Sequence, residues 1–466
     1  MNKTKILKKY ILFDLLASIL VLILFMIFRK TVNNISIFEG THFFVPSYNY
    51  IASFFLFPIA CAIVHSLSGF YLNPIKQSRV SLILNTFTAS LFISMTVFSV
   101  IMLNDVVVSY EYYYYSLLVL FILLFVVTYF FRSIIFSQIR HNFRTKKWTT
   151  NTIIIGTGDK ALKIAHELEI NATHNSIIGF IATDNTVVVP KNMVLGNINK
   201  LDTIFGNYNI EESIIAIDNA DEHQLFTIIN SLYKYNIDIQ FTPRLYEILT
   251  GSAKISKMGI IPLVSITTSS LSEFEASLKR FFDIIISIFS IIFLSPMLIY
   301  YMIKIKKDSK GPIFYRQERI GRLGKPFKIL KFRTMFVNSE NGTPQLSSLE
   351  DERITNVGKV MRKYRIDEIP QFWNILKGDM SLVGPRPERR FYINQIIEEA
   401  PYYCLLYKIR PGLTSWGPIK IGYSDTVEKM IERLNYDIIY LDNMSFLTDL
   451  KILIYTFEII FKGKGM

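Results

Sequence analysis

The sequence is poor in the residues on which most metal and nucleophile sites depend. It has two cysteines among 466 residues, Cys61 and Cys404, so a disulfide framework and a thiolate metal site are excluded and we expect buried, inert thiols. No histidine follows His223, so the rest of the chain cannot by itself supply Ser–His or Cys–His catalysis or imidazole-bound zinc. Chemistry there must rest on carboxylates, aided by a hard cation such as Mg²⁺ that prefers carboxylate and phosphate oxygens.

Charge is also scarce, and long stretches lack it. Only 19% of the residues are charged and 50% are hydrophobic, which is apolar for a soluble protein. Four runs in the first third, at residues 10–28, 50–72, 80–103 and 113–131, carry almost no charge beyond Asp14. Each has about the 20 residues that are needed to cross a hydrocarbon layer of roughly 30 Å. The runs therefore predict a four-helix transmembrane bundle.

The cations that flank these runs predict how the bundle is oriented. Lysine and arginine gather before the first run, between the second and third runs, and after the fourth run (Lys3, Lys5, Lys8, Lys9, Lys76, Arg79, Arg132, Arg140, Arg144, Lys146 and Lys147). The loop between the third and fourth runs carries Asp105 and Glu111 and no cation. The positive-inside rule therefore places both ends of the bundle in the cytoplasm. The first run lacks a small-residue cleavage site, so we expect it to be retained.

The chain as a whole is basic, with a formal net charge of +13. Nucleic acid is the general partner of such a charge, but the sequence has no basic tail and no nucleic-acid motif. We therefore expect no nucleic acid as a partner, and instead membrane lipids with anionic headgroups and substrates that carry phosphate.

A soluble region begins near Asn151 with a short β-branched strand, the glycine turn Gly156-Thr-Gly158 and a helical stretch to Glu169. Strand-like runs at 177–182 and 213–218 alternate with helical ones, which predicts a Rossmann-like α/β domain. Gly156 and Gly158 could bring a helix N-terminus to the phosphate of a dinucleotide, or the domain could be a scaffold or a regulatory part. Asp184 lies in a turn, so no acidic residue is placed to hold a ribose.

A fifth apolar run, at residues 281–303, differs from the first four. Asp283 lies inside it, which is costly in lipid away from the interface. Ser295-Pro296 also lies inside it, and an internal proline breaks a helical hydrogen bond. Cations flank both ends, which favours a re-entrant helix that enters and leaves on one membrane face. The alternative is a proline-kinked span, which would place the rest of the chain outside the cell.

Two strand-like segments follow, at residues 313–320 and 327–335, joined by a glycine-containing turn that predicts a hairpin. Period-two alternation puts Lys331 and Arg333 on one face of the second strand. These cations could hold a diphosphate, with arginine bidentate. The alternative is a solvated cationic edge.

The adjacent carboxylates Asp367 and Glu368 precede Pro370, and cations precede them. Proline is favoured at the first position of a helix, so we expect a helix to open at Pro370. Its buried stripe is expected at Ile369, Phe372, Trp373 and Leu376. The two acids would then lie at the positive end of the helix, which also attracts phosphate. This pattern suggests a phosphoryl-transfer site; the alternative is a pair of ordinary N-terminal helix acids.

The last part of the chain resembles the bacterial sugar transferase family, the polyprenyl-phosphate glycosyl-1-phosphate transferases. The matching segments occur in order between residues 279 and 464. They are Phe282-Asp283, Ser295-Pro296, Gly311-Pro-Ile-Phe314, Gln317-Glu-Arg-Ile-Gly321, Lys331-Phe-Arg-Thr-Met335, Asp367-Glu368, Lys377-Gly-Asp-Met-Ser381, Pro385-Arg-Pro387 and Arg410-Pro-Gly412. With four spans and a Rossmann-like domain, the whole chain is similar to the long members of this family.

The resemblance implies a function and a site. Asp367 is implied as the nucleophile that attacks a UDP-sugar, releases UMP and passes the sugar 1-phosphate to undecaprenyl phosphate. Glu368 would assist as an acid, a base or an orienting group, and Mg²⁺ would bind at Asp367. Arg362 matches the family's phosphate-binding arginine, Lys331 matches its essential lysine, and Arg386 would face the nucleotide. Ser295 and Pro296 would break the re-entrant helix.

The expected fold is therefore a membrane protein of α and α/β parts. Residues 1–148 form a four-span bundle, 149–270 a Rossmann-like domain, and 271–466 a re-entrant helix with a small α/β catalytic domain. The resemblance also implies a multi-pass protein of the bacterial inner membrane, with its catalytic part on the cytoplasmic face, and a homodimer is plausible.

Two features leave other interpretations open. Many family members continue after Arg-Pro-Gly with Gly-Trp-Ala-Gln-Val, whereas this chain has Thr414-Ser-Trp-Gly-Pro-Ile-Lys420. The apolar run at 446–461 would lie on the membrane surface or pack as core.

A membrane-anchored nucleotide-sugar dehydratase or epimerase would need a second glycine turn and a Tyr-x-x-x-Lys pair. Tyr300 and Lys304 have that spacing but end the fifth apolar run. A non-catalytic scaffold of a polysaccharide export assembly is the third interpretation.

Overall fold

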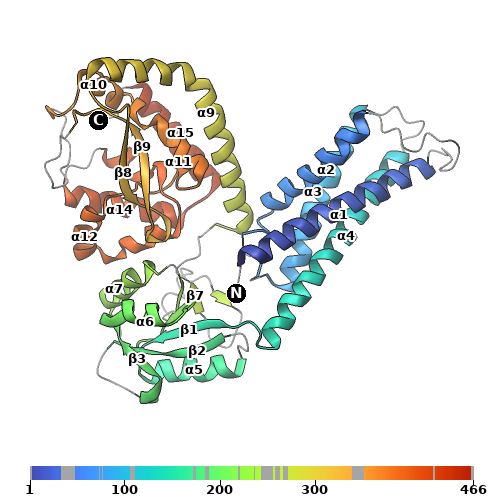
Figure 1. Cartoon of the computed structure of the whole chain (residues 1–466), viewed down its shortest axis with the longest axis horizontal. Coiled ribbons are helices and arrows are strands. Elements are labelled where there is room, and N and C mark those ends of the chain that lie inside the picture. Colours follow the sequence, from blue (N-terminus) through green and yellow to red (C-terminus); the bar gives the residue numbers. More distant parts are fainter. Residues whose placement is uncertain are drawn as a thin grey trace. The chain divides into compact units, whose positions relative to one another are not determined.

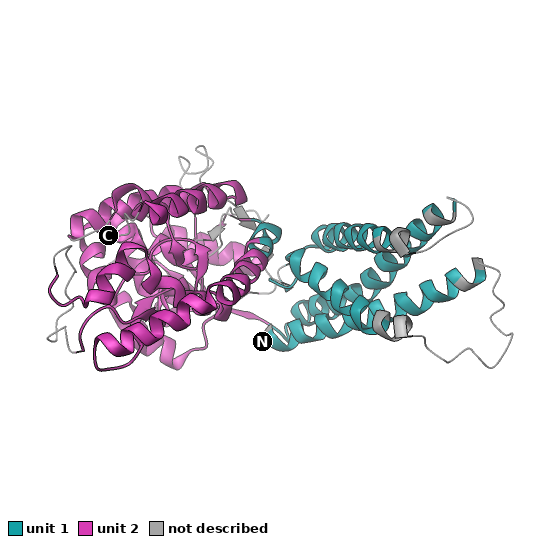
Figure 2. Cartoon of the chain, turned by 90° about the horizontal axis from the view of Figure 1, so that it is seen from above, with its two compact units in different colours: residues 1–148, 272–278 teal, residues 149–271, 279–466 magenta. Residues whose placement is uncertain are grey.

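The structure is a computed structural model of the chain. It describes residues 3–32, 48–72, 74–75, 77–104, 111–171, 175–183, 188–218, 221–235, 237–242, 255–257, 263–265, 271–337, 351–422 and 426–462. Lys76, Asp105 and Asp184, used above for orientation and ribose binding, lie outside these residues. The chain forms two compact units, one of residues 1–148 and 272–278 and the other of residues 149–271 and 279–466 (Figure 2).

The four N-terminal apolar runs form the helices of the first unit, as the sequence predicts. These are α1 (Lys3–Val32), α2 (Tyr48–Leu67), α3 (Arg79–Asn104) and α4 (Glu111–Arg144). Among the described residues, α1, α3 and α4 contain segments long and apolar enough to cross a membrane, and the described apolar part of α2, Phe54–Leu67, is shorter. Large apolar side chains along these helices remain exposed, which suits contact with lipid.

Asp14, which stands out in the first apolar run, is neutralised inside the bundle. Nε and Nη2 of Arg132 on α4 donate to its two carboxylate oxygens at 2.9 and 2.7 Å, and the Tyr71 hydroxyl donates to it at 2.6 Å. Arg132 also donates to Thr86 of α3. A charge in an apolar bundle is tolerated when it is paired and hydrogen-bonded in this way, so the pair joins α1, α3 and α4.

The second unit begins with a seven-stranded sheet in the order β3-β2-β1-β4-β5-β7-β6. The strands are β1 (Thr150–Ile155), β2 (Asn175–Ala182), β3 (Val194–Asn197), β4 (Glu212–Ile215), β5 (Asp238–Phe241), β6 (Ile255–Lys257) and β7 (Leu263–Ser265). The first five in spatial order pair in parallel, whereas β7 pairs antiparallel with β5 and with β6. The predicted strand, glycine turn and helix are therefore confirmed in a Rossmann-like α/β arrangement (Figure 1).

Helices cover both faces of this sheet because its strands are apolar on both sides. These helices are α5 (Asp159–Asn171), α6 (Leu201–Asn207) and α7 (Glu222–Tyr233), with the short 3-10 turns η2 (Lys191–Met193) and η3 (Ile198–Lys200). Ile154 packs with Ile164 of α5, and Ile155 packs with Leu232 of α7 on the opposite face. The second cluster continues into residues 392–434, so the middle and last regions share one core. The three-part division of the chain stays a prediction.

Helix α9 (Glu273–Asp308) leads from the first unit into the second, and Figure 1 shows it as one ribbon that bends along its length. A capping box begins it: Ser272 Oγ accepts from the Glu275 N–H, and Glu275 Oε2 accepts from the Ser272 N–H. Pro296 lies inside the helix and cannot donate to the carbonyl of Ile292. Ser295 Oγ donates to that carbonyl at 2.7 Å, so the Ser-Pro pair frees a backbone oxygen and also satisfies it.

The last region folds into short elements around two small sheets. These elements are β8 (Phe314–Ile320), η4 (Arg322–Gly324), β9 (Pro326–Phe332), α10 (Asn356–Lys363), η5 (Ile366–Gln371), α11 (Phe372–Lys377), β10 (Ser381–Val383), α12 (Arg390–Glu399), η6 (Pro401–Lys408), β11 (Gly412–Thr414), α13 (Trp416–Ile421), α14 (Val427–Asp442) and α15 (Phe446–Phe461). The predicted hairpin is confirmed, because β8 and β9 pair antiparallel from Phe314↔Phe332 to Ile320↔Pro326. The strands β10 and β11 pair in parallel.

The first turns of α9 within the second unit are anchored to this region by polar contacts. Asp283 is buried and its Oδ1 accepts from the Leu382 N–H at 2.9 Å, which explains an acid within an apolar run. Arg280 donates to the carbonyls of Ile375 and Leu376 at 2.6 and 2.9 Å. The membrane helix and the motif-bearing region are therefore joined through backbone groups.

The exposure of helix α15 bears on whether residues 446–461 lie on the membrane surface or pack as core. Among its side chains only Ile452 is buried, whereas Leu447, Ile454 and Phe457 are exposed and Phe461 is 84% exposed. An apolar stripe left uncovered on a helix favours the membrane surface over a packed core.

Candidate active site

Asp367 and Glu368 lie in η5, a 3-10 turn that runs from Ile366 to Gln371, and both are 8% exposed. The predicted helix start at Pro370 is therefore wrong. Arg365 adopts a left-handed backbone conformation with φ 53° and turns the chain so that η5 begins before the proline. The turn packs along β9, which places both carboxylates beside the strand that carries Lys331.

The predicted buried stripe of the following helix is wrong at Trp373, whereas Ile369, Phe372 and Leu376 are partly buried. Trp373 is 62% exposed, whereas Asn374 and Ile375 of α11 are buried. The reason lies at the backbone of β9. Asn374 Oδ1 accepts from the Leu330 N–H at 2.9 Å and its Nδ2 donates to the Lys328 carbonyl at 2.8 Å. A polar side chain that satisfies strand groups turns inward, so Asn374 takes an inward position and Trp373 is left exposed.

Glu368 is held by three cations. Lys331 Nζ lies 2.8 Å from Oε1, Arg386 Nη2 lies 3.3 Å from the same oxygen, and Arg365 Nη1 lies 3.3 Å from Oε2. The structure thus brings together Glu368, Lys331 and Arg386, which the sequence selected from three separate motifs. It adds Arg365, which sequence reasoning noted only as one of several cations.

Asp367 is different from its neighbour. Within the described ranges, no hydrogen bond or ion pair joins its carboxylate to another side chain. Burial raises the pKa of the Asp367 carboxyl above its usual range; Lys331 opposes this shift and the charge of Glu368 adds to it. Burial alone would also raise the pKa of Glu368, but Lys331, Arg386 and Arg365 together hold it well below its usual range. The pair therefore contains one fixed anion and one carboxylate without a bound partner.

The other two predicted arginines make contacts outside this ion cluster. Arg362 Nε donates to the Thr334 hydroxyl at 3.0 Å. Arg333 lies beyond the end of β9 and is buried, and its Nη2 donates to the Ser309 carbonyl at 2.7 Å while Nη1 donates to the Lys310 carbonyl at 3.1 Å. The structure therefore does not bring Arg333 to the carboxylate pair, because strand alternation ends before this residue. Its role in holding substrate stays a prediction.

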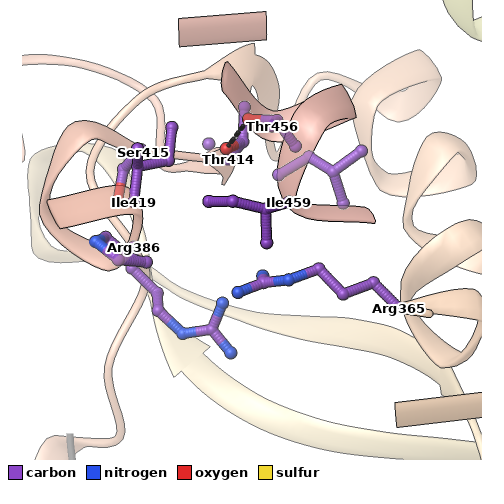
Figure 3. Close-up of a pocket in the computed structure, with 10 residues that line it drawn as sticks. Arg365, Arg386, Thr414, Ser415, Ile419, Thr456 and Ile459 are labelled. Carbon is purple, nitrogen blue, oxygen red and sulfur yellow. Dashed lines mark hydrogen bonds between the residues drawn. The ribbon is translucent and has the colours of Figure 1, made fainter. Parts of the chain in front are cut away.

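A pocket opens beside the cluster (Figure 3). Arg365 and Arg386 extend toward one another from opposite sides of it. The remaining wall is hydroxyl-bearing or apolar and is made by residues Gly412, Leu413, Thr414, Ser415, Pro418, Ile419, Thr456 and Ile459. Thr414 and Thr456 are joined by a hydrogen bond of 2.6 Å. Two guanidiniums against such a wall suit a group with phosphate at one end and less polar atoms at the other.

Sequence reasoning missed most of this pocket. The segment from Thr414 to Ile419 was recognised only as a departure from the family pattern, and Thr456 lies in an apolar run without a motif. The departure itself was the available signal, since substitutions that differ within a family often lie where a ligand varies.

Asp367 and Glu368 differ in what they could offer to Mg²⁺. Among the described residues, no group of three or more His, Cys, Asp or Glu side chains could hold a metal ion. Glu368 is already held by cations, which leaves Asp367 as a single oxygen ligand. Mg²⁺ is commonly held by one or two carboxylates together with substrate phosphates and water, so the residues fit this ion when phosphate supplies the other ligands.

The glycine turn of the middle domain holds an acidic side chain. Asp218 Oδ1 accepts from the Lys160 N–H at the start of α5 at 3.0 Å. A Cβ at Gly158 would lie 1.7 Å from Asp218 Oδ2, so the close approach that requires glycine is to this carboxylate. At Gly156 φ is +122° and a Cβ would lie 2.2 Å from the Ala216 carbonyl oxygen. Asp218 thus occupies the helix N-terminus where a dinucleotide phosphate would bind.

Two family models match the chain. The model of bacterial sugar transferases matches residues 274–463, and a model of CoA-binding domains matches residues 66–243.

Curated relatives match about half of the chain. The chain is 37% identical over 230 residues to a UDP-N-acetylgalactosamine-undecaprenyl-phosphate N-acetylgalactosaminephosphotransferase of Aeromonas hydrophila, which covers 49% of the chain and 54% of that protein. It is 34% identical over 256 residues to a UDP-glucose:undecaprenyl-phosphate glucose-1-phosphate transferase of Klebsiella pneumoniae, covering 54% of each. It is 37% identical to an uncharacterised sugar transferase of Bacillus subtilis, covering 41% of the chain and 90% of that protein. The chain thus spans about half the length of the first two relatives.

Proposed function

The chain belongs to the bacterial sugar transferase family, and from this premise we propose that it transfers a sugar 1-phosphate from a UDP-sugar to undecaprenyl phosphate. The two curated relatives described above are named for this reaction with different sugars. The observation that carries the proposal is that two adjacent buried carboxylates have different surroundings. Glu368 is fixed by Lys331, Arg386 and Arg365, whereas Asp367 has no such partner.

In the first step, a carboxylate oxygen of Asp367 attacks the β-phosphorus of the UDP-sugar. A bond forms between that oxygen and phosphorus, and the bond from phosphorus to the bridging oxygen breaks, so UMP leaves with the bridging oxygen. The sugar 1-phosphate is then held as an acyl phosphate. The cations around the pair screen the negative charges of carboxylate and phosphates, which otherwise repel each other.

In the second step, a phosphate oxygen of undecaprenyl phosphate attacks the same phosphorus. The bond to Asp367 breaks, the carboxylate is restored, and the product is a polyprenyl diphosphosugar. Glu368 remains ionised between its cations and orients Lys331 and Arg386 toward the phosphates. Such a reaction is an early membrane step of exopolysaccharide, capsule, O-antigen or glycan synthesis.

Mg²⁺ would be held by Asp367 and by phosphate oxygens, where it would neutralise charge on the transferred phosphoryl group. The pocket between Arg365 and Arg386 would receive phosphate-bearing parts of the substrates, with Arg386 toward the nucleotide. Arg362 would contact phosphate after leaving Thr334.

We place the protein in the bacterial inner membrane with its catalytic part on the cytoplasmic face, where nucleotide sugars are found. The bent helix α9 with its Ser295-Pro296 pair would be re-entrant, and α15 would lie on the same surface. For the middle domain we propose a scaffold role, since Asp218 takes the N–H that a bound phosphate would need. A homodimer would be compatible with this arrangement.

The dehydratase or epimerase interpretation has less support. Tyr300 and Lys304 lie on α9, where the Lys304 ammonium sits over the Tyr300 ring at 5.5 Å. This places the Tyr-x-x-x-Lys spacing on the apolar helix rather than beside a nucleotide fold. A scaffold without catalysis would not require buried carboxylates of different protonation behaviour.

The proposal is tested by trapping the intermediate. The purified protein is incubated with a panel of UDP-sugars and Mg²⁺ without lipid acceptor, then digested with trypsin. We expect the peptide Ile366–Lys377 to gain the mass of one sugar phosphate less one water, together with stoichiometric UMP.

The matched controls are Asp367→Asn, which should abolish both the adduct and transfer, and Asp202→Asn, an exposed acid of the middle domain that should leave both unchanged. An unmodified peptide in protein that still turns over would refute the covalent scheme. Full transfer by Asp367→Asn would refute the site.

A further inference from the structure

Two chain segments contribute to the pocket wall, and one buried carboxylate contacts both. The first segment is the Pro385-Arg-Pro387 turn, which carries Arg386, and the second runs from Thr414 to Ile419. Asp437 of α14 is 2% exposed. Its Oδ1 accepts from the Gly417 N–H at 3.3 Å, and its carboxyl also accepts from the Arg386 main-chain N–H. Asp437 therefore ties the two segments to one helix.

The same turn is held from its other end. Arg319 of β8 donates from Nη1 to the Pro387 carbonyl at 3.1 Å, and the Ile320 N–H donates to the Glu388 carbonyl at 3.0 Å. The Arg386 backbone is thus fixed through its own N–H on one side and through the following carbonyls on the other. Proline on both sides of Arg386 restricts the backbone further.

These contacts belong to a buried network of alternating charges. The Glu388 carboxylate lies between Arg319, at 3.1 Å, and Arg433 of α14, to which it is also hydrogen-bonded. Arg433 and Glu388 are 6% and 5% exposed. One turn along α14 from Arg433 lies Asp437, whose pKa burial raises to about 6 while Arg433 lowers it. Positive and negative side chains alternate along this network, so their charges balance one another.

Glycine at position 417 permits this arrangement. A Cβ there would lie 2.1 Å from Cγ of Arg433, so only glycine lets the pocket segment approach α14 closely enough for its N–H to reach Asp437. The close approach and the hydrogen bond to Asp437 both occur at Gly417. The pocket segment is therefore held against α14 by a specific hydrogen bond as well as by packing.

We propose that Asp437 and Arg433 are positioning residues that fix Arg386 and the Thr414–Ile419 segment around the substrate pocket. This inference rests on the proposed sugar-phosphate transfer. Helix α14 carries no motif of its own, yet its Asp437 binds the main chain of both pocket segments. Neither residue touches substrate; both act through Arg386 and the Gly417 segment.

The test compares Asp437→Asn, Asp437→Ala, Arg386→Ala and the double variant Asp437→Ala/Arg386→Ala. Each is assayed with undecaprenyl phosphate and the UDP-sugar from which the unaltered protein releases UMP fastest. Asp437→Asn keeps one carbonyl oxygen that can accept from the Gly417 N–H, so it should lose clearly less activity than Asp437→Ala. Asp437→Ala should lower kcat/KM about 10- to 100-fold, as small misplacements of a binding group do. The decrease in kcat and the increase in KM of Asp437→Ala should be in the same proportion as those of Arg386→Ala.

The double variant gives the decisive reading. If Asp437 acts through Arg386, the double variant should be little worse than Arg386→Ala alone. Losses that multiply, or a kcat and KM pattern unlike that of Arg386→Ala, would overturn the proposal. An unchanged rate in Asp437→Ala would overturn it as well.

A matched control separates positioning from stability. Glu212 of β4 is a buried carboxylate that accepts from Thr152 and Asn175 at 3.1 and 2.7 Å, far from the pocket in sequence. Glu212→Ala should lower the Tm without changing the kinetic pattern. If the unaltered protein shows no transfer, the proposed function fails instead, and this outcome is visible before any variant is compared.

Discussion

At the scale of single residues, the site depends on two adjacent carboxylates that meet different surroundings. Glu368 touches Lys331, Arg386 and Arg365, so its charge is compensated locally. Asp367 is equally buried, but no side chain in the described part of the chain forms an ion pair with it, so its ionised form is less stabilised and more nucleophilic toward phosphorus. A fixed anion that orders the cations and a neighbouring carboxylate that is free to attack are the two roles that such a transfer needs.

This difference predicts a pH profile. Asp367 attacks only when ionised, so adduct formation should fall as the pH drops through its raised pKa, at a pH above the ordinary aspartate value of about 3.9. Glu368, with its pKa held low, should not titrate in that range. In Lys331→Met the opposing charge is lost, so the pKa of Asp367 should rise and the acid limb should move to higher pH.

Single-turnover formation of the adduct, followed by UMP release across pH, measures the effect. Lys328→Met is the matched control, because Lys328 is an exposed residue of the same strand whose side chain does not enter the cluster. An acid limb that stays in place in Lys331→Met would contradict the assignment of Asp367 as the titrating group.

At the scale of elements, α9 connects the membrane to the site. It is capped at its start by Ser272 and Glu275, it is anchored near the motif region by Arg280 and Asp283, and it contains Pro296. The carbonyl that Pro296 leaves without a helical donor is taken by Ser295, which removes the cost of a free polar group at membrane depth. The helix can therefore bend within lipid without exposing an unsatisfied backbone oxygen.

A re-entrant α9 predicts that both of its ends face the cytoplasm. Cysteines placed at Phe274 and Lys307 should react with a membrane-impermeant maleimide only after spheroplasts are permeabilised, since both positions are exposed on the helix. The two native thiols are buried and should give little background. Ser36→Cys, in the predicted external loop, should react in intact spheroplasts. Reaction at Lys307 in intact spheroplasts would mean that α9 crosses the membrane.

At the scale of the whole molecule, the proposed reaction would exchange one phosphoanhydride for another. The bond broken in the UDP-sugar resembles the bond formed in the polyprenyl diphosphosugar, so the overall free-energy change should be small. The net charge of +13 suits both substrates, which are anionic, and the anionic membrane surface that holds the acceptor.

The transfer should therefore run backward. Enzyme supplied with polyprenyl diphosphosugar and UMP should produce UDP-sugar, detected by chromatography, and enzyme that carries the adduct should do so with UMP alone. Asp367→Asn should produce none. Forward turnover without any return of nucleotide sugar under excess UMP would contradict the exchange mechanism.

Much of this organisation follows from local sequence. The apolar runs, the strand-turn-helix at Asn151 and the hairpin that carries Lys331 were predicted because each depends on periodicity or turn residues within a short window. Asp367, Glu368 and Arg386 were selected through the order of motifs and the family resemblance, and their roles stay predictions. The expected helix start at Pro370 failed because a left-handed Arg365 begins the turn earlier, and a backbone conformation of one residue has no periodic signature.

The sequence by itself therefore determined the membrane helices, the α/β region and the chemical type of the site. Only the tertiary structure decided which cations hold Glu368, why Asp367 has none, that Arg333 binds main-chain carbonyls, and that Asn374 rather than Trp373 faces inward. It alone placed Asp218 at the start of α5 and Asp437 behind the pocket. The physical reason is that hydrogen bonds and ion pairs join residues far apart in the chain, whereas periodicity and turn chemistry report only on neighbours.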